Sequence, residues 1–118
     1  MKKILVIGST GQIGSELTKV LRETYGNENV VAGYIKGAEP KGWLAESGPM
    51  AEADVTNPQM IADIVKQYQI DTIYNLAALL SVVAESKPRL AWKIGIDGLW
   101  NILEVAREHG CAVFTPSS

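Results

Sequence analysis

The chain has 118 residues, which is enough for one small domain with a hydrophobic core. Hydrophobic residues make up 47% and charged residues 20%, as in soluble globular proteins, and a formal net charge of -2 favours neither nucleic acid nor an anionic membrane as a partner. The single cysteine, Cys111, cannot form an internal disulfide, and no apolar stretch is long enough to span a bilayer, so we expect a cytoplasmic protein.

A glycine-rich turn directly follows the first predicted strand, which covers residues 3–7. Gly8, Gly11 and Gly14 have the spacing G-x-x-G-x-x-G and precede a helix predicted over residues 12–25. Gly8 allows a tight turn, Gly11 lets the backbone approach a pyrophosphate, and Gly14 lets the helix pack closely on the sheet. The free N–H groups of the helix N-terminus then face the anion. This context favours a dinucleotide site over an ordinary glycine turn.

The first half of the chain continues with a helix, two strands and a long loop. The helix over residues 12–25 is expected to bury one apolar face, formed by Ile13, Leu17, Val20 and Leu21. A second strand is predicted over residues 29–35. Residues 36–49 are rich in glycine, proline and charge and are expected to form a loop, and a short third strand covers residues 50–53.

The second half alternates helices and strands in the same way. A helix opens at Asn57 and Pro58 and runs to about Tyr68, with an apolar stripe of Ile61, Ile64 and Val65. A fourth strand is predicted over residues 71–76. A long helix covers residues 88–108 and stops at Gly110, and a fifth strand covers residues 111–115, which places Cys111 in an apolar run of the core.

Strands joined by helical crossovers pair in parallel. The alternation therefore predicts an α/β fold of the Rossmann type, a doubly wound parallel sheet of about five strands in the order 3-2-1-4-5. In such a sheet the ligand crevice lies between the first and fourth strands, at their carboxyl ends.

The long helix has two apolar faces. One face contains Ile94, Gly98, Ile102 and Val105, and the other contains Trp92, Ile96, Leu99, Trp100 and Leu103. A surface helix needs only one apolar stripe, so the second face is expected to pack on a partner or on another part of the same protein.

Four segments together resemble the extended short-chain dehydrogenase/reductase family: residues 8–14, 54–56, 75–78 and 98–104. More narrowly, residues 11–17, 25–30, 78–81 and 114–118 look like the L-threonine 3-dehydrogenases of that family. The resemblance implies that residues 1–118 form the dinucleotide-binding domain at the N-terminus of a longer NAD-dependent oxidoreductase, which works as a homodimer through the helix over residues 88–109.

The resemblance also implies roles for single residues. Backbone N–H groups of Gln12 and Ile13 would bind the pyrophosphate, and Asp54 would accept from the adenine amino group with the Val55 N–H beside it. Other residues would line the cofactor cleft, namely Leu76, Ala77 and Ala78. Ser81 would touch the substrate amino acid, and Ser118 would be the catalytic hydroxyl that bonds the reacting oxygen. The alternatives are that Asp54 only caps a turn and that Ser81 and Ser118 are solvated loop residues. No metal site is expected.

Three departures from the family pattern affect the cofactor and the active site. Tyr34 stands where an acid usually binds the adenosine ribose, and Lys36 is close enough to favour a 2′-phosphate, so NAD is expected ahead of NADP without excluding it. Gly95 replaces an asparagine that helps to organise the active site. Asn75 replaces a common histidine.

The family's general base is a tyrosine in a Tyr-x-x-x-Lys pair, and none of the four tyrosines of this chain has a lysine four residues later. A tyrosine needs the charge of that lysine to work near neutral pH. The chain is therefore expected to be inactive on its own. Two alternatives to an L-threonine 3-dehydrogenase stay open: a nucleotide-sugar epimerase or reductase of the same family, and a non-catalytic dinucleotide-binding module.

Overall fold

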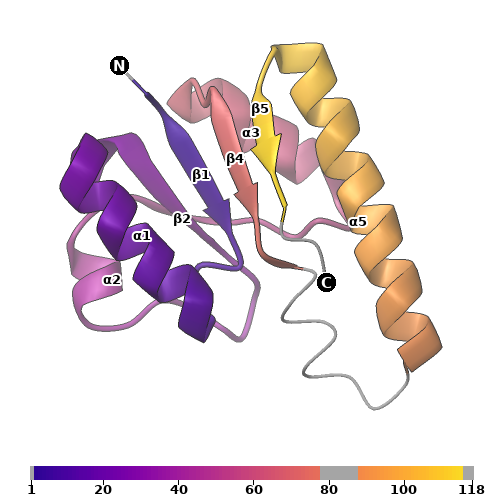
Figure 1. Cartoon of the computed structure of the whole chain (residues 1–118), viewed down its shortest axis with the longest axis horizontal. Coiled ribbons are helices and arrows are strands. Elements are labelled where there is room, and N and C mark those ends of the chain that lie inside the picture. The colour runs from indigo at the N-terminus through magenta and orange to yellow at the C-terminus, as the bar shows by residue number, and fades with distance from the viewer. Residues whose placement is uncertain (1, 78–87, 116–118) are drawn as a thin grey trace.

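The computed structural model describes residues 2–77 and 88–115 of the chain. Its centre is a five-stranded parallel sheet with the order β3-β2-β1-β4-β5, as predicted (Figure 1). The strands are β1 (Ile4–Ile7), β2 (Val30–Tyr34), β3 (Met50–Glu52), β4 (Thr72–Asn75) and β5 (Ala112–Phe114).

Strand β1 is the central strand of the sheet. Its first residue, Ile4, pairs with Val30 of β2 and with Thr72 of β4, and Ile7 pairs with Gly33 and Asn75. The carboxyl ends of β1, β2 and β4 therefore lie at one level, which is where the predicted ligand crevice opens.

Helices α1 (Gln12–Tyr25), α3 (Pro58–Tyr68) and α5 (Pro88–His109) agree with the predicted helices to within a residue. Helix α3 begins as expected, because the Asn57 side chain accepts a hydrogen bond from the Met60 N–H and Pro58 occupies the first turn. A short 3-10 helix, η1 (Asn27–Asn29), precedes β2. The prediction of a loop over residues 36–49 was wrong in part, because the segment contains a helical turn, α2 (Trp43–Glu46).

Alternate residues of β1 build the cores on the two faces of the sheet. Leu5 and Ile7 belong to a cluster that includes α3 and α5, whereas Ile4 and Val6 belong to a smaller cluster with α1. In Figure 1, α1 accordingly lies on one side of the sheet and α3 on the other. The α3 stripe of Ile61, Ile64 and Val65 is buried as predicted.

The predicted buried face of α1 was only partly correct. Leu21 is buried and Leu17 packs against the smaller core, but Ile13 and Val20 are exposed. Two polar residues on α1, Thr18 and Arg22, are buried instead. Thr18 satisfies its hydroxyl within the helix, donating to the Gly14 carbonyl oxygen at 2.7 Å.

Arg22 holds the loop between β2 and β3 against α1. Its side chain is 1% exposed, and all five of its N–H donors are used. Nε and Nη2 donate to the Val30 carbonyl oxygen, Nη2 also to that of Pro49 (2.7 Å), and Nη1 to the Leu44 carbonyl oxygen (2.9 Å) and to the Ser47 hydroxyl (2.8 Å). Burial lowers the pKa of Arg22 from its ordinary value, but an arginine pKa is high enough for the group to remain charged. The α2 turn therefore forms around a buried cation.

The two apolar faces of α5 differ in solvent exposure, as predicted. Ile102 and Val105 are buried, whereas Ile96, Trp100 and Leu103 are 48%, 64% and 44% exposed. The predicted contributions of Trp92 and Ile94 fall on side chains outside the described part. Within residues 2–77 and 88–115, no helix combines the length and apolar character needed to span a membrane.

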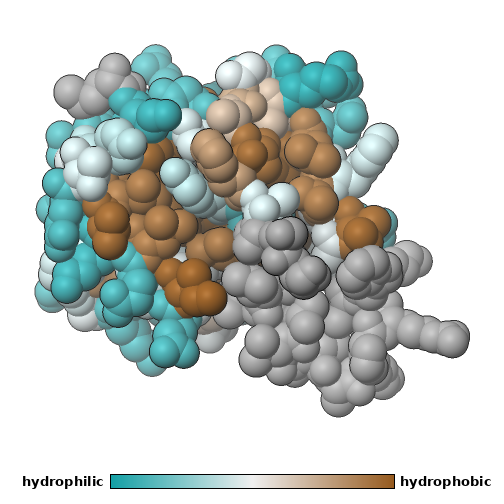
Figure 2. Space-filling view, viewed as in Figure 1, coloured by the Kyte–Doolittle hydropathy of each residue, from teal (hydrophilic) through white to brown (hydrophobic). Residues whose placement is uncertain are grey.

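The last strand carries apolar groups that no described helix covers. Phe114 is 52% exposed and stacks on Tyr74 of the neighbouring strand, with ring centroids 5.1 Å apart. Figure 2 shows hydrophobic residues across this face of the molecule, from α1 towards β5. Cys111, just before β5, is half-buried and donates to the Ile70 carbonyl oxygen at 3.2 Å, and burial raises the pKa of its thiol. The prediction that Cys111 is a core residue is consistent with its packing against the larger core cluster.

Candidate functional site

The turn between β1 and α1 has the geometry that its glycines predict. Gly8 has φ +82°, and a Cβ there would lie 3.0 Å from the Leu76 carbonyl carbon at the end of β4. A Cβ on Gly14 would overlap the Gly8 carbonyl oxygen. The absence of a side chain at Gly8 therefore lets the β1–α1 loop pack directly against the end of β4. The absence of a side chain at Gly14 lets the start of helix α1 pack directly against this loop.

The N-terminus of α1 is open. Gly11 is its N-cap residue, with φ -72° and ψ 169°, no side chain caps the helix, and the first turn contains no acid. The first helical bond runs from the Ser15 N–H to the Gly11 carbonyl oxygen at 2.8 Å. Among the described residues, the N–H groups of Gln12 and Ile13 have no hydrogen-bond acceptor. Free N–H groups at the positive end of a helix dipole form an anion site.

Ser9 joins this turn to β2, a role that sequence reasoning missed. Its side chain is completely buried, and both its N–H and its hydroxyl donate to the Gly33 carbonyl oxygen, at 3.0 Å and 2.8 Å. Gly33 is crowded, since a Cβ there would lie 2.9 Å from the Val6 carbonyl oxygen. The only available signal was a small hydroxyl residue inside the glycine motif, because its partner is a main-chain atom 24 residues away.

Tyr34, the next residue, ends β2 beside this contact. It is half-buried, and its carbonyl oxygen accepts from the Ala53 N–H at 2.7 Å. The chain then turns, and Lys36 is exposed. The Glu39 carboxylate accepts from the Gly37 N–H at 2.9 Å, which lowers the pKa of Glu39 from its ordinary value. The loop after Tyr34 therefore carries the negative charge of Glu39, which the positive charge of Lys41 also stabilises.

Asp54 and Val55 follow β3 and form a tight turn. The Asp54 Oδ1 accepts from both the N–H and the hydroxyl of Thr56, at 2.9 Å and 2.7 Å. This oxygen therefore caps the turn, which is the alternative role predicted for Asp54. Within the described part, Oδ2 of Asp54 accepts no hydrogen bond and the Val55 N–H donates none. One acceptor and one donor on adjacent residues are thus left open, so the turn and a ligand can both use Asp54.

The end of β4 completes the described part of the crevice. The N–H of buried Leu76 donates to the Ile7 carbonyl oxygen at 2.9 Å, and the N–H of Ala77 donates to the buried Asn75 side chain at 3.2 Å. Asn75 therefore fixes the turn out of β4, at the position where the resembled family often has histidine. Gly95 on α5 has open space where a side chain would be.

The structure brings Gly8 together with Leu76, and Ser9 with the residue before Tyr34. The predicted site residues Ala78, Ser81 and Ser118 lie outside the described residues. Within the described part, no three histidine, cysteine, aspartate or glutamate side chains gather as metal ligands.

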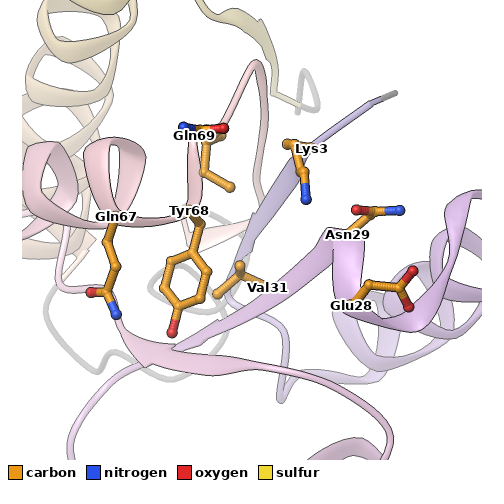
Figure 3. Close-up of a pocket in the computed structure, with 8 residues that line it drawn as sticks. Lys3, Glu28, Asn29, Val31, Gln67, Tyr68 and Gln69 are labelled. Atoms are coloured by element: carbon orange, nitrogen blue, oxygen red, sulfur yellow. The ribbon is translucent and has the colours of Figure 1, made fainter.

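A separate hollow of about 200 Å³ lies at the other end of the strands, away from the predicted crevice (Figure 3). It is lined by Lys3, Glu28, Asn29, Val31, Gln67, Tyr68, Gln69 and Ile70. Lys3 and Asn29 precede β1 and β2, so this hollow is at the amino ends of the strands and is distinct from the predicted crevice.

Comparison with known proteins is consistent with this geometry. Residues 4–118 match the model of the NAD dependent epimerase/dehydratase family. The chain belongs to this family. Members of the NAD dependent epimerase/dehydratase family bind NAD(P), and the uncapped helix end and the glycine turn of this chain suit the pyrophosphate of such a cofactor.

Several proteins are similar to this chain over all or nearly all of its length. An L-threonine dehydrogenase from Clostridium difficile is 51% identical, with a TM-score of 0.85 over 100% of this chain and 37% of that one. A GalE-like L-threonine dehydrogenase from Cupriavidus necator is 37% identical, with a TM-score of 0.85 over 98% of this chain and 37% of that one. An uncharacterized epimerase/dehydratase of Staphylococcus saprophyticus is 45% identical over 100% of this chain and 37% of that protein. The chain therefore spans little more than a third of these relatives.

Proposed function

We propose that the chain is the NAD-binding part of an L-threonine 3-dehydrogenase, which transfers a hydride from the C3 hydroxyl carbon of L-threonine to NAD. The observation that carries the proposal is 51% identity to the Clostridium difficile L-threonine dehydrogenase over the entire chain. The open N-terminus of α1 supports the cofactor part of the proposal. The UDP-glucose 4-epimerase from Thermotoga maritima has the same fold at 22% identity, a level that supports the fold alone.

In this proposal the described residues at the N-terminus of α1 and in the turn after β3 bind the cofactor. The N–H groups of Gln12 and Ile13 bind the pyrophosphate, and the missing side chain at Gly11 lets it approach the backbone. Adenine presents an amino donor and a ring-nitrogen acceptor on one edge. These two groups complement the open Asp54 Oδ2 and the open Val55 N–H.

The remaining roles concern the substrate. Bound NAD supplies the hydride acceptor, while the protein orients the substrate and handles its proton. We assign the hydroxyl of Ser118 to the reacting oxygen and that of Ser81 to the amino acid, and Ala77 and Ala78 to the wall of the cleft. A tyrosine–lysine pair beyond the present chain supplies the base in this scheme, because none of its tyrosines has a lysine four residues later.

The activity test uses the full-length protein and the 118-residue chain side by side. The full-length protein is expected to reduce NAD when L-threonine is added, and the short chain is expected to show no turnover above background. General acid–base catalysis contributes about 10²–10⁴-fold, and the short chain has no tyrosine–lysine pair. NADH absorbance with L-threonine detects a dehydrogenase. An epimerase makes no net NADH, so the parallel assay with UDP-glucose measures formation of its C4 epimer instead. Threonine-dependent turnover by the short chain would show that another group acts as the base.

A second prediction concerns the cofactor preference at Tyr34. Tyr34→Asp is expected to raise the ratio of NAD to NADP affinity by about tenfold or more, because a carboxylate binds both ribose hydroxyls and repels a 2′-phosphate. The wild type is expected to prefer NAD only modestly, since the Tyr34 phenol does not repel a 2′-phosphate and the positive charge of Lys36 favours it. Titration with both dinucleotides measures the ratio, and Lys36→Gln reports the lysine contribution. An unchanged ratio in Tyr34→Asp places Tyr34 away from the ribose.

A third prediction concerns the outer face of α5. We expect two copies to associate through Ile96, Trp100 and Leu103, a pairing worth several kcal/mol at roughly 25 cal/mol per Å² of buried apolar area. Strand β5 offers a competing route, because its residues are uncharged and Phe114 is exposed. Light scattering distinguishes the two routes. Trp100→Glu dissociates a helix dimer but leaves aggregation through β5, and a wild type that stays monomeric at high concentration contradicts both.

A further inference from the structure

The turn that carries Asp54 and Val55 is held from behind by α5. The Asn101 side-chain Nδ2 donates to the Val55 carbonyl oxygen at 2.9 Å, across 46 residues of sequence. Asn101 is half-buried, and within the described part this is the side-chain bond that links the turn to α5. Gly98, one helical turn earlier, makes room for the Val55 side chain, because a Cβ on Gly98 would lie 2.5 Å from Val55 Cγ2.

These two contacts fix the orientation of the Val55 peptide groups. The carbonyl oxygen faces the Asn101 amide, and the side chain packs against Gly98 and is buried in the larger core. The Val55 N–H, on the preceding peptide plane, remains without an acceptor among the described residues, beside the open Asp54 Oδ2. The direction of this N–H is therefore set by α5, while the Asp54 Oδ1 bonds to Thr56 set the direction of the carboxylate.

We propose that Asn101 is the positioning residue of the adenine half of the cofactor site, acting through the Val55 peptide. The inference rests on the proposed assignment of adenine to Asp54 and Val55. Asn101 touches no cofactor atom in this arrangement. Asn101 keeps the Val55 N–H at a fixed distance from the Asp54 Oδ2. This donor and this acceptor together recognise a base that offers a ring-nitrogen acceptor next to an amino donor.

The test compares NAD with nicotinamide hypoxanthine dinucleotide, in which the base presents the opposite pattern, a carbonyl acceptor next to a ring N–H donor. Wild-type full-length protein is expected to bind NAD at least about tenfold more tightly than the hypoxanthine analogue. In Asn101→Ala that preference is expected to fall about three- to tenfold, because the affinity for NAD drops while that for the analogue changes little. Calorimetric titration measures both affinities.

Two further variants separate positioning from general stability. Asp97→Asn is the matched control, since Asp97 is exposed on the same helix and lines the same hollow beside Thr56 as Asn101 does; it is expected to keep the wild-type preference. Asn101→Asp places an acceptor against the Val55 carbonyl oxygen and is expected to lose more of the preference than Asn101→Ala. The amide NMR shifts of Val55 and Thr56, recorded without ligand, are expected to move in both Asn101 variants and not in Asp97→Asn.

The outcomes are distinct. If the wild type binds neither dinucleotide, the proposed function is wrong. If it binds both equally well, the adenine assignment is wrong, and the inference about Asn101 is wrong with it. If it prefers NAD and Asn101→Ala keeps the full preference, the cofactor site stands and the positioning role of Asn101 is wrong.

Discussion

Replacing Gly11 by valine is expected to weaken dinucleotide binding by about 100-fold or more, which corresponds to about 2.7 kcal/mol, while the fold remains intact. Gly11 has φ -72° and ψ 169°, an extended conformation that every residue adopts, so the substitution introduces no backbone strain. Its branched side chain would instead stand at the N-terminus of α1, where we propose that the pyrophosphate approaches the N–H groups of Gln12 and Ile13.

Calorimetric titration with NAD and circular dichroism of the free protein measure binding and folding separately. Gly14→Ala is the contrasting variant. Its added methyl would overlap the Gly8 carbonyl oxygen, so we expect this smaller substitution to destabilise the fold as well as binding. Equal NAD affinities in the wild type and in Gly11→Val would show that the cofactor does not lie against this turn.

Arg22→Met is expected to lower the free energy of unfolding by about 3–5 kcal/mol, since each buried acceptor left without a donor costs about 1–3 kcal/mol. The substitution keeps much of the side-chain length but removes the Arg22 bonds to Val30, Leu44, Ser47 and Pro49. The Pro49 carbonyl oxygen keeps the Ala32 N–H as a donor. These partners belong to the start of β2, to α2 and to the entry into β3. The α2 turn is therefore expected to lose its order first.

Urea unfolding measures this effect, with two comparison variants. Arg22→Lys keeps the positive charge but has no planar fork of donors, so it is expected to recover only a minor part of the lost stability. Arg107→Met removes an exposed arginine whose ion pair with Glu104 lies on the surface of α5, and it is expected to leave the urea midpoint nearly unchanged. An Arg22→Met midpoint within error of the wild type would mean that the buried bonds contribute no net stability.

The sequence predicted the fold well because the strong local signals agree with one another. Apolar runs at β1, β2 and β4 are bounded by glycine, asparagine or aspartate, and the helices between them carry caps such as Asn57 and Gly110. Parallel strands joined by helices then leave few possible orders. The prediction failed at the α2 turn, because four helical residues in a loop rich in glycine and proline have no periodicity of their own and depend on Arg22.

The glycine positions of the candidate site were predictable, because the backbone conformation or a close contact requires a residue without a side chain there. Gly8 and Gly14 follow from a positive φ and from a close helix contact, and both can be read from their spacing alone. Asp54 was predicted as an adenine ligand through resemblance alone, and the structure adds that Oδ1 bonds to Thr56 while Oδ2 accepts no hydrogen bond within the described part. The second apolar face of α5 was also readable, since Trp100 and Leu103 interrupt the polar side of the helix.

The sequence by itself therefore determined the sheet, its helices and the turn that faces the predicted cofactor, because these depend on local spacing and on apolar periodicity. Only the tertiary structure decided how the edge of the site is held. Ser9 bonds to Gly33, Asn101 to Val55 and Arg22 to the loop before β3. In each case a side chain donates to a main-chain carbonyl oxygen far along the chain. Every residue has such an oxygen, so the acceptor leaves no trace in the sequence and appears only when the fold brings the two segments together.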